Sequence, residues 1–293
     1  MDPVDSIGIF DSGFGGLTVM RAIRELMPHE NIIYFGDTAR LPYGSKSAET
    51  ILRYTLESAT YLVAQGIKIL VIACHTSCSA ALEEVRKAID IPIIGITELG
   101  VEEVLRRLPN GKIAVLGTRA TITSGIFQKQ ITLGGNCKTP GSCKINDFES
   151  VCNSLLELFP IACPLFVPLV EEGYVDHPMT TAIAQEYLRP FKNQKIDGAL
   201  LGCTHYPLLQ AIIQQELGPD VQLIDPAIAC AEKTKSLLLE KNLLNLSTDL
   251  PHYQFVVSDD PEKFRLLGKT FLNYPIEHVH LKSFGSDTAW LRN

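Results

Sequence analysis

The chain has 293 residues, of which 46% are hydrophobic and 20% are charged, and its formal net charge is −7 at pH 7. This composition is typical of a globular protein with a large core, and the acidic balance argues against nucleic acids and anionic membranes as partners. No apolar run approaches the roughly 18 residues of a membrane span, and the acidic N-terminus does not resemble a signal peptide, so we expect a cytoplasmic protein.

The first expected element is a short apolar strand, Ser6–Phe10, which runs into Asp11 and a glycine-rich turn. A dinucleotide-binding G-x-G-x-x-G motif would need a third glycine where Thr18 stands, so that motif is incomplete. Glycines at such a turn let a small ligand approach the backbone. Asp11 belongs either to the cap of the next helix, expected over Thr18–Leu26, or to a functional site.

Asn31–Phe35 is the next predicted strand, and a loop rich in Pro, Gly and Ser follows at 41–47. Ser47 opens a helix that runs to about Gln65, and another strand is expected at Ile91–Ile96. This alternation of strands and helices predicts a parallel, doubly wound sheet.

Between this helix and the strand at Ile91–Ile96, the segment Ile69–Ser79 begins with six apolar residues. Such a run is typical of a strand buried on both faces. The strand ends at Cys74, hydroxyl residues follow, and a helix is expected over Ala80–Ala88. Ligands bind at this end of the strands in open α/β sheets, and a helix N-terminus there favours an anion or a thiolate. A single buried cysteine at such a place is more often a small core residue.

A second α/β unit is expected after Thr97, because one domain usually takes roughly 100–200 residues. Its first strand, Lys112–Leu116, ends in a hydroxyl-rich loop that contains Thr118. Residues 134–150 hold glycines, a proline and two cysteines, which indicates a surface insertion.

Ala162–Glu172 contains two prolines, so we expect an edge or irregular strand that delivers two glutamates. Gly198–Leu209 then repeats the design of the first cysteine segment: an apolar strand ends at Cys203, and Thr204 and His205 follow. Two strand-end cysteines in matching contexts favour a functional pair over two core residues.

The eight cysteines do not form the pattern of a secreted disulfide framework. Cys137, Cys143 and Cys152 have neither the spacing nor the surroundings of a zinc site, so we expect free thiols and no metal. Cys74 and Cys78 form a C-x-x-x-C pair, which leaves a thiol-redox role through a reversible disulfide as one alternative.

Five segments carry a family resemblance: D-S-G-F-G-G-L at Asp11–Leu17, P-Y-G at Pro42–Gly44, A-C at Ala73–Cys74, F-V-P-L-V-E at Phe166–Glu171 and L-G-C-T-H-Y-P-L-L at Leu201–Leu209. With these segments in this order over nearly the whole chain, the sequence resembles the cofactor-independent aspartate/glutamate racemase family, in particular its glutamate racemases.

The resemblance implies two flavodoxin-like, doubly wound parallel-sheet domains related by pseudo-twofold symmetry, with the active site in the cleft between them. The first domain would combine residues 1–97 with 207–293, and the second would span 98–206. This division agrees with the break expected after Thr97.

Racemisation without a cofactor needs two acid/base groups on opposite faces of the substrate, and a thiolate with a thiol meets that need. By resemblance, Cys74 and Cys203 are this pair, and Asp11, Glu171 and His205 assist them. The resemblance also implies a set of substrate-binding residues. They are Asp11, Ser12, Pro42, Tyr43, Gly44, His75, Thr76, Thr118, Thr121, Thr204 and His205.

The implied function is the interconversion of L- and D-glutamate, which supplies D-glutamate for peptidoglycan, with the amino acid as the small-molecule partner. No cofactor is expected, and no lysine occupies the strand-end motifs to bind pyridoxal phosphate. A homodimer is compatible with the resemblance. The alternative within the superfamily is a racemase or lyase for another substrate, such as aspartate, because His75 stands where the family usually has asparagine.

Overall fold

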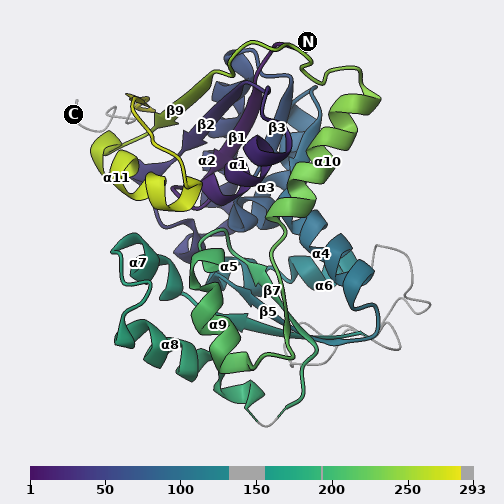
Figure 1. Cartoon of the computed structure of the whole chain (residues 1–293), viewed down its shortest axis with the longest axis vertical. Coiled ribbons are helices and arrows are strands. Elements are labelled where there is room, and N and C mark those ends of the chain that lie inside the picture. Colours follow the sequence, from purple (N-terminus) through teal and green to yellow (C-terminus); the bar gives the residue numbers. More distant parts are fainter. Residues whose placement is uncertain (132–155, 193, 285–293) are drawn as a thin grey trace.

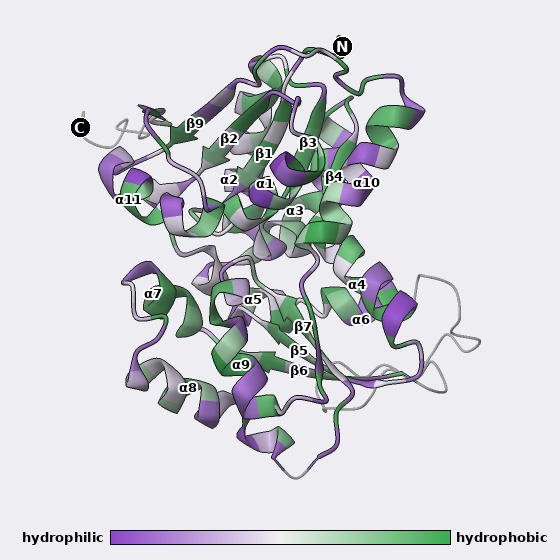
Figure 2. Cartoon of the chain, in the orientation of Figure 1, coloured by the Kyte–Doolittle hydropathy of each residue, from purple (hydrophilic) through white to green (hydrophobic). Residues whose placement is uncertain are grey.

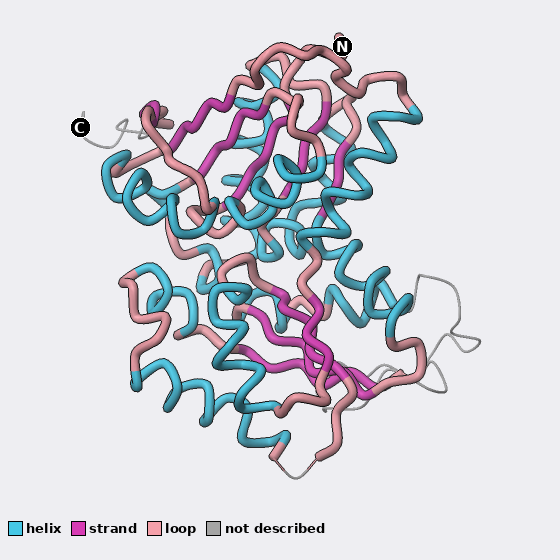
Figure 3. Tube along the Cα trace, viewed as in Figure 1, coloured by secondary structure: helices cyan, strands magenta, loops and turns pink. Residues whose placement is uncertain are grey.

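The computed structural model describes residues 1–131, 156–192 and 194–284. The expected insertion at 134–150, with Cys137, Cys143 and the later Cys152, lies outside the described residues. Within them the chain forms two parallel sheets, each flanked by helices (Figures 1 and 3). We call each sheet with its helices a lobe, the six-stranded and the four-stranded lobe. Figure 2 shows the strands as mainly hydrophobic and the outer helix faces as hydrophilic.

The six-stranded sheet has the order β10-β9-β2-β1-β3-β4. Its strands are β1 (Ile7–Asp11), β2 (Ile32–Gly36), β3 (Ile69–Ile72), β4 (Ile93–Gly95), β9 (Tyr253–Val257) and β10 (Val279–Leu281). Helices on one face are α1 (Leu17–Leu26), α10 (Ala227–Glu240) and α11 (Pro261–Leu272), and those on the other are α2 (Ala48–Ala64) and α3 (His75–Ala88) (Figure 1). Helix α4 (Ile96–Arg107) leads to the second sheet.

The four-stranded sheet has the order β6-β5-β7-β8. Its strands are β5 (Lys112–Gly117), β6 (Glu157–Ala162), β7 (Gly198–Gly202) and β8 (Gln222–Ile224). Helices α8 (Pro178–Leu188) and α9 (Gln210–Leu217) pack together, while α6 (Ile126–Ile131) packs on α4. Two short helices, α5 (Arg119–Thr123) and α7 (Phe166–Glu171), lie toward the other lobe (Figure 1).

Both sheets wind in the same way. The first strand of each lobe, β1 or β5, lies between the second and the third, and all pairings are parallel. The strand order therefore reverses between β1 and β3 and between β5 and β7, where open α/β sheets bind ligands. This confirms the predicted fold class, and it puts Cys74, after β3, and Cys203, after β7, at corresponding points.

Strand β8 pairs with β7 in the four-stranded sheet, Gly198 opposite Gln222. The chain therefore returns to the six-stranded lobe only after Ile224. The domain limits at 97 and 207 stay a prediction. The pairing of β8 with β7 supports a second limit later than 207, because β8 still belongs to the four-stranded sheet.

The structure corrects two predicted elements. Helix α3 begins at His75 and not near Ala80, because Cys74 acts as its N-cap: the Cys74 Sγ accepts the Ser77 backbone N–H at 3.4 Å. The segment expected as an irregular strand contains helix α7. Its Pro168 lies in the first turn, where the missing N–H is not needed.

A wholly buried ion pair joins distant parts of the six-stranded lobe. Lys68 Nζ donates to Glu30 Oε2 and to the Pro3 carbonyl, both at 2.5 Å. Glu30 Oε1 accepts the backbone N–H of Asn245 at 2.8 Å. The pair thus ties the returning C-terminal part of the chain to its beginning. Among the described helices, none is long and apolar enough to cross a membrane.

Candidate active site

A pocket of about 230 Å³ lies where the C-terminal ends of the two sheets face each other. The six-stranded lobe contributes the turn after β1, the loop at 41–45 and the start of α3. The four-stranded lobe contributes the start of α5, helix α7 and the turn after β7. The pocket therefore occupies both topological switch points at once.

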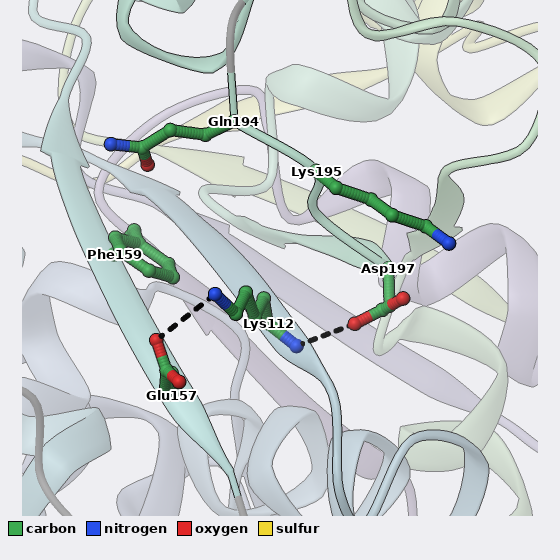
Figure 4. A pocket seen from close by; sticks show the side chains of 6 residues that line it. All are labelled: Lys112, Glu157, Phe159, Gln194, Lys195 and Asp197. Atoms are coloured by element: carbon green, nitrogen blue, oxygen red, sulfur yellow. Dashed lines mark hydrogen bonds and ion pairs between the residues drawn. The ribbon is translucent and has the colours of Figure 1, made fainter.

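A larger depression of about 640 Å³ lies at the opposite end of the four-stranded sheet (Figure 4). Lys112 reaches Glu157 there with an Nζ–Oε2 distance of 3.7 Å, and the Lys112 backbone N–H donates to Asp197. These groups sit at the N-terminal ends of β5 and β6, away from the edge where doubly wound sheets bind ligands. The pocket between the lobes is therefore the candidate site.

Cys74 forms the N-cap of α3. Its Sγ accepts the Ser77 backbone N–H at 3.4 Å and donates to Ser12 Oγ at 3.4 Å. Burial, together with the nearby Asp11, raises the pKa of Cys74 to about 11, against the lowering effect of these hydrogen bonds. At neutral pH, Cys74 is therefore a thiol, placed to donate a proton.

Cys203 lies in a different electrostatic environment, next to a hydrogen-bonded pair formed by His205 and Glu171. Its Sγ is 3.9 Å from Nδ1 of His205, and Nε2 of His205 is 2.8 Å from Oε1 of Glu171. Burial alone would lower the pKa of His205, but its contacts with Cys203 and Glu171 raise it to about 10. The imidazolium that results is a cationic partner for a thiolate.

Asp11 lies behind the pocket wall and is wholly buried. Its Oδ2 accepts the Gly13 backbone N–H at 2.9 Å, and its Oδ1 accepts the Thr204 hydroxyl at 3.3 Å. Burial raises the pKa of Asp11, and the charge of His205 opposes this rise. Asp11 thus connects the first strand of one lobe to the Cys203 turn of the other.

Three threonine hydroxyls close the pocket on another side. Thr76 Oγ1 lies 2.9 Å from Thr118 Oγ1 and 3.2 Å from Thr121 Oγ1, and the latter two are 2.9 Å apart. Thr76 belongs to α3, whereas the other two belong to α5 and its cap, so the triangle spans the lobes. Gly44 packs on it: a Cβ at this position would lie 2.7 Å from Thr118 Cβ.

His75 is the unusual member of the wall. Its side chain is 2% exposed, and neither ring nitrogen has a hydrogen-bond partner among the described residues. Its ring packs near Phe127, with centroids 6.2 Å apart. Burial lowers the pKa of His75 to about 3, so the ring is neutral. A buried polar group without a partner is costly, and a ligand group in the pocket would satisfy it.

The structure brings the predicted site residues together from six separate segments. Those that line the pocket are Ser12, Pro42, Tyr43, Gly44, Cys74, His75, Thr76, Thr118, Glu171, Cys203, Thr204 and His205. Asp11 and Thr121 do not line it, and each supports a threonine that does.

Sequence reasoning missed other lining residues. They are Leu41, Ser45, Arg119, Pro164, Val167 and Pro168. Arg119 is exposed and starts α5, and its only local signal was its place directly after the strand-end Thr118. Pro164, Val167 and Pro168 come from α7 and its approach, a segment that we expected to be a strand.

Chemically, the pocket presents two thiols from opposite lobes, one beside hydroxyl and amide donors and one beside an imidazolium. Such a pair can remove a proton on one face of a small molecule and return one on the other. Hydroxyl groups, the Arg119 cation and the α3 N-terminus suit carboxylates. In the described ranges, His, Cys, Asp and Glu do not gather in threes that could hold a metal ion.

Residues 7–234 match the model of the Asp/Glu/Hydantoin racemase family. The glutamate racemase of Chlorobaculum tepidum is 45% identical over 278 residues, which are 94% of this chain and 95% of that protein. That of Syntrophus aciditrophicus is 42% identical over 273 residues, 93% and 94% of the two chains. The crystal structure of glutamate racemase from Francisella tularensis in complex with D-glutamate has a TM-score of 0.84 and 37% identity, covering 96% of this chain and 98% of that one.

Proposed function

Because the chain belongs to the Asp/Glu/Hydantoin racemase family and is an amino-acid racemase, we propose that it interconverts L- and D-glutamate. We further propose that the α-proton is transferred through Cys74 and Cys203. The observation that carries the mechanism is the position of the two cysteines: each ends the third strand of its lobe, and both line one pocket. The relatives named above are glutamate racemases, which supports glutamate as the substrate.

In one direction, the Cys203 thiolate, paired with the His205 imidazolium, takes the α-proton from the face of the substrate that it meets. The Cys74 thiol then donates its proton to the opposite face of the carbanion, which inverts the centre. The Cys74 thiolate that remains is stabilised by the Ser77 N–H and the Ser12 hydroxyl. The reverse reaction uses the same groups with acid and base exchanged.

Substrate binding falls to the remaining lining groups. The hydroxyls of Thr76 and Thr118 and the free N–H groups at the start of α3 are donors for carboxylates. The neutral His75 ring offers one donor and one acceptor, and it is bulkier than the asparagine usual in the family. Asp11 holds Thr204 in place beneath the substrate.

The first experiment incubates the purified protein with L-glutamate in heavy water, without added cofactor. We expect loss of optical rotation together with deuterium at the α-carbon. Cys74→Ser and Cys203→Ser should each abolish racemisation, since each removes the acid or base on one face. No signal with glutamate, but racemisation of aspartate, would replace the substrate and keep the mechanism.

Cys78→Ser serves as the matched control for these variants. Cys78 is buried one turn after Cys74 and donates to the Ile72 carbonyl at 3.3 Å, outside the pocket lining. We expect this variant to remain active. Loss of activity here would instead favour a reversible disulfide between Cys74 and Cys78. The supply of D-glutamate to peptidoglycan, the cytoplasmic location and the homodimer stay predictions.

A further inference from the structure

We propose that Asp37 is a positioning residue that holds the pocket wall Leu41–Ser45 in place through Tyr43, and thereby sets the affinity for the substrate. This inference rests on the proposed function. Asp37 does not line the pocket and touches none of the reacting groups. It is wholly buried at the end of β2, where its backbone N–H donates to the Asp11 carbonyl at 3.1 Å.

The Asp37 carboxylate gathers three side chains from two distant parts of the sequence. Its Oδ2 accepts the Arg40 Nε–H at 2.6 Å and the Tyr43 hydroxyl, and its Oδ1 accepts the Ser258 hydroxyl at 2.7 Å. A buried carboxylate with this many donors is held firmly, because any donor that leaves exposes an uncompensated charge. Asp37 is therefore a fixed anchor at the base of the loop.

Tyr43 connects the Asp37 carboxylate to the pocket wall. The residue is 1% exposed and lines the pocket, yet its hydroxyl is used by Asp37 and is not offered to a ligand. Its ring packs against Phe10 and Tyr54, with centroids 6.5 and 5.8 Å away. The next residue, Gly44, lies directly on Thr118 of the other lobe. A displaced Tyr43 would therefore disturb both the wall and the contact between the lobes.

Arg40 fixes the orientation of the Asp37 carboxylate. Its guanidinium lies over the rings of Tyr54 and Phe284, 4.0 and 4.7 Å from their centroids. It also forms ion pairs with Asp37 and Glu57. These contacts give the buried carboxylate its counter-charge from outside the pocket, so the cluster shapes the pocket wall without placing a charge in it.

The test compares Asp37→Asn, Tyr43→Phe and the double variant in steady-state racemisation of glutamate. We expect each single change to raise KM by roughly ten-fold, with kcat changed by less than about three-fold, because a charge-assisted hydrogen bond behind the wall is lost. The double variant should raise KM no more than the worse single change, since both remove the same contact. Additive effects, or unchanged KM in folded variants, would overturn the proposal.

Ser258→Ala is the matched control, because it removes another hydrogen bond to the same carboxylate and one from the Ala39 backbone N–H, but none made by Leu41–Ser45. We expect its KM to change by less than about two-fold, well below the change in Tyr43→Phe. An equal rise in KM would show that Asp37 acts through general stability and not through Tyr43.

Amide hydrogen exchange separates this proposal from the proposed function. In Asp37→Asn and Tyr43→Phe, the amides of Leu41–Ser45 should exchange faster than in the unaltered protein, whatever its substrate. Unchanged exchange in this loop would overturn the positioning role even in an active racemase. Failure of the unaltered protein to racemise glutamate would refute the function alone.

Discussion

The surroundings of His205 show how two neighbouring groups can reverse the effect of burial on a titratable side chain. His205 is 3% exposed, and burial by itself would favour the neutral ring. Contacts with Cys203 and with Glu171 reverse this and raise the pKa of His205 to about 10. The imidazolium therefore persists through the neutral range and is lost only in alkaline solution.

We expect a bell-shaped pH profile of kcat/KM, whose alkaline limb reflects loss of the His205 proton and then of the Cys74 proton, near pH 10 and pH 11. Glu171→Gln removes one of the two groups, beside Cys203, that raise the pKa of His205, so the ring loses its proton at lower pH. The alkaline limb should move down by about one pH unit. Initial rates measured from about pH 6 to pH 11 test this.

Glu172→Gln is the neighbouring control. Glu172 is exposed, pairs with Lys263 at 3.1 Å and does not line the pocket. Its substitution should leave the alkaline limb in place. Rates in the unaltered protein that show no alkaline decline up to about pH 11 would contradict the two-thiol mechanism.

At the scale of elements, the turn after β1 and the turn after β7 pack tightly against each other. The β1–α1 turn approaches the turn after β7 at Gly15, where a Cβ would lie 2.2 Å from Thr204 Oγ1 and 2.6 Å from His205 Nδ1. No side chain fits unless one turn retreats. Glycine here is required by the close approach of the two lobes.

Gly15→Ala should therefore push His205 away from Cys203 and lower kcat/KM by about 100-fold, as expected for a displacement near 1 Å. Gly268→Ala is the overpacking control, since its Cβ would meet only the tips of Ile276 and Leu17. Activity assays and thermal unfolding of both variants separate displacement from general destabilisation. Equal activity losses in the two would contradict this account of the turn.

At the scale of the whole molecule, the buried neutral His75 lowers the stability of the fold in acid. Its pKa is lowered from 6.5 to about 3 in the folded protein. As the pH falls below 6.5, the unfolded chain binds a proton that the folded chain refuses. The free energy of unfolding therefore decreases as the pH falls from about 6.5 toward 3.

His75→Asn removes this proton-linked loss. The variant's free energy of unfolding minus that of the unaltered protein should be about 2 kcal/mol larger at pH 5 than at pH 8. Urea unfolding at the two pH values measures the difference. His177→Asn, which replaces an exposed N-cap histidine by another capping residue, is the control. Parallel pH dependence in His75→Asn and the unaltered protein would contradict the buried neutral ring.

The sequence by itself determined the parallel α/β class, most strands and helices, and the two cysteines at matching strand ends. Apolar runs, prolines and glycines act over a few residues, so their effect can be read from local order. The start of α3 at His75 and the helix α7 were misjudged because Cys74 acts as a helix N-cap and Pro168 lies in the first turn of its helix, where proline is tolerated.

Only the tertiary structure decided how the pocket residues contact one another and which further residues join them. The threonine triangle, the unpartnered His75 ring, the cation Arg119 and the anchor at Asp37 depend on the contact between lobes or between segments up to 221 positions apart. No local pattern encodes such contacts. They follow from the packing of two sheets whose strand ends face each other, and that packing sets the charge and solvation of each group in the site.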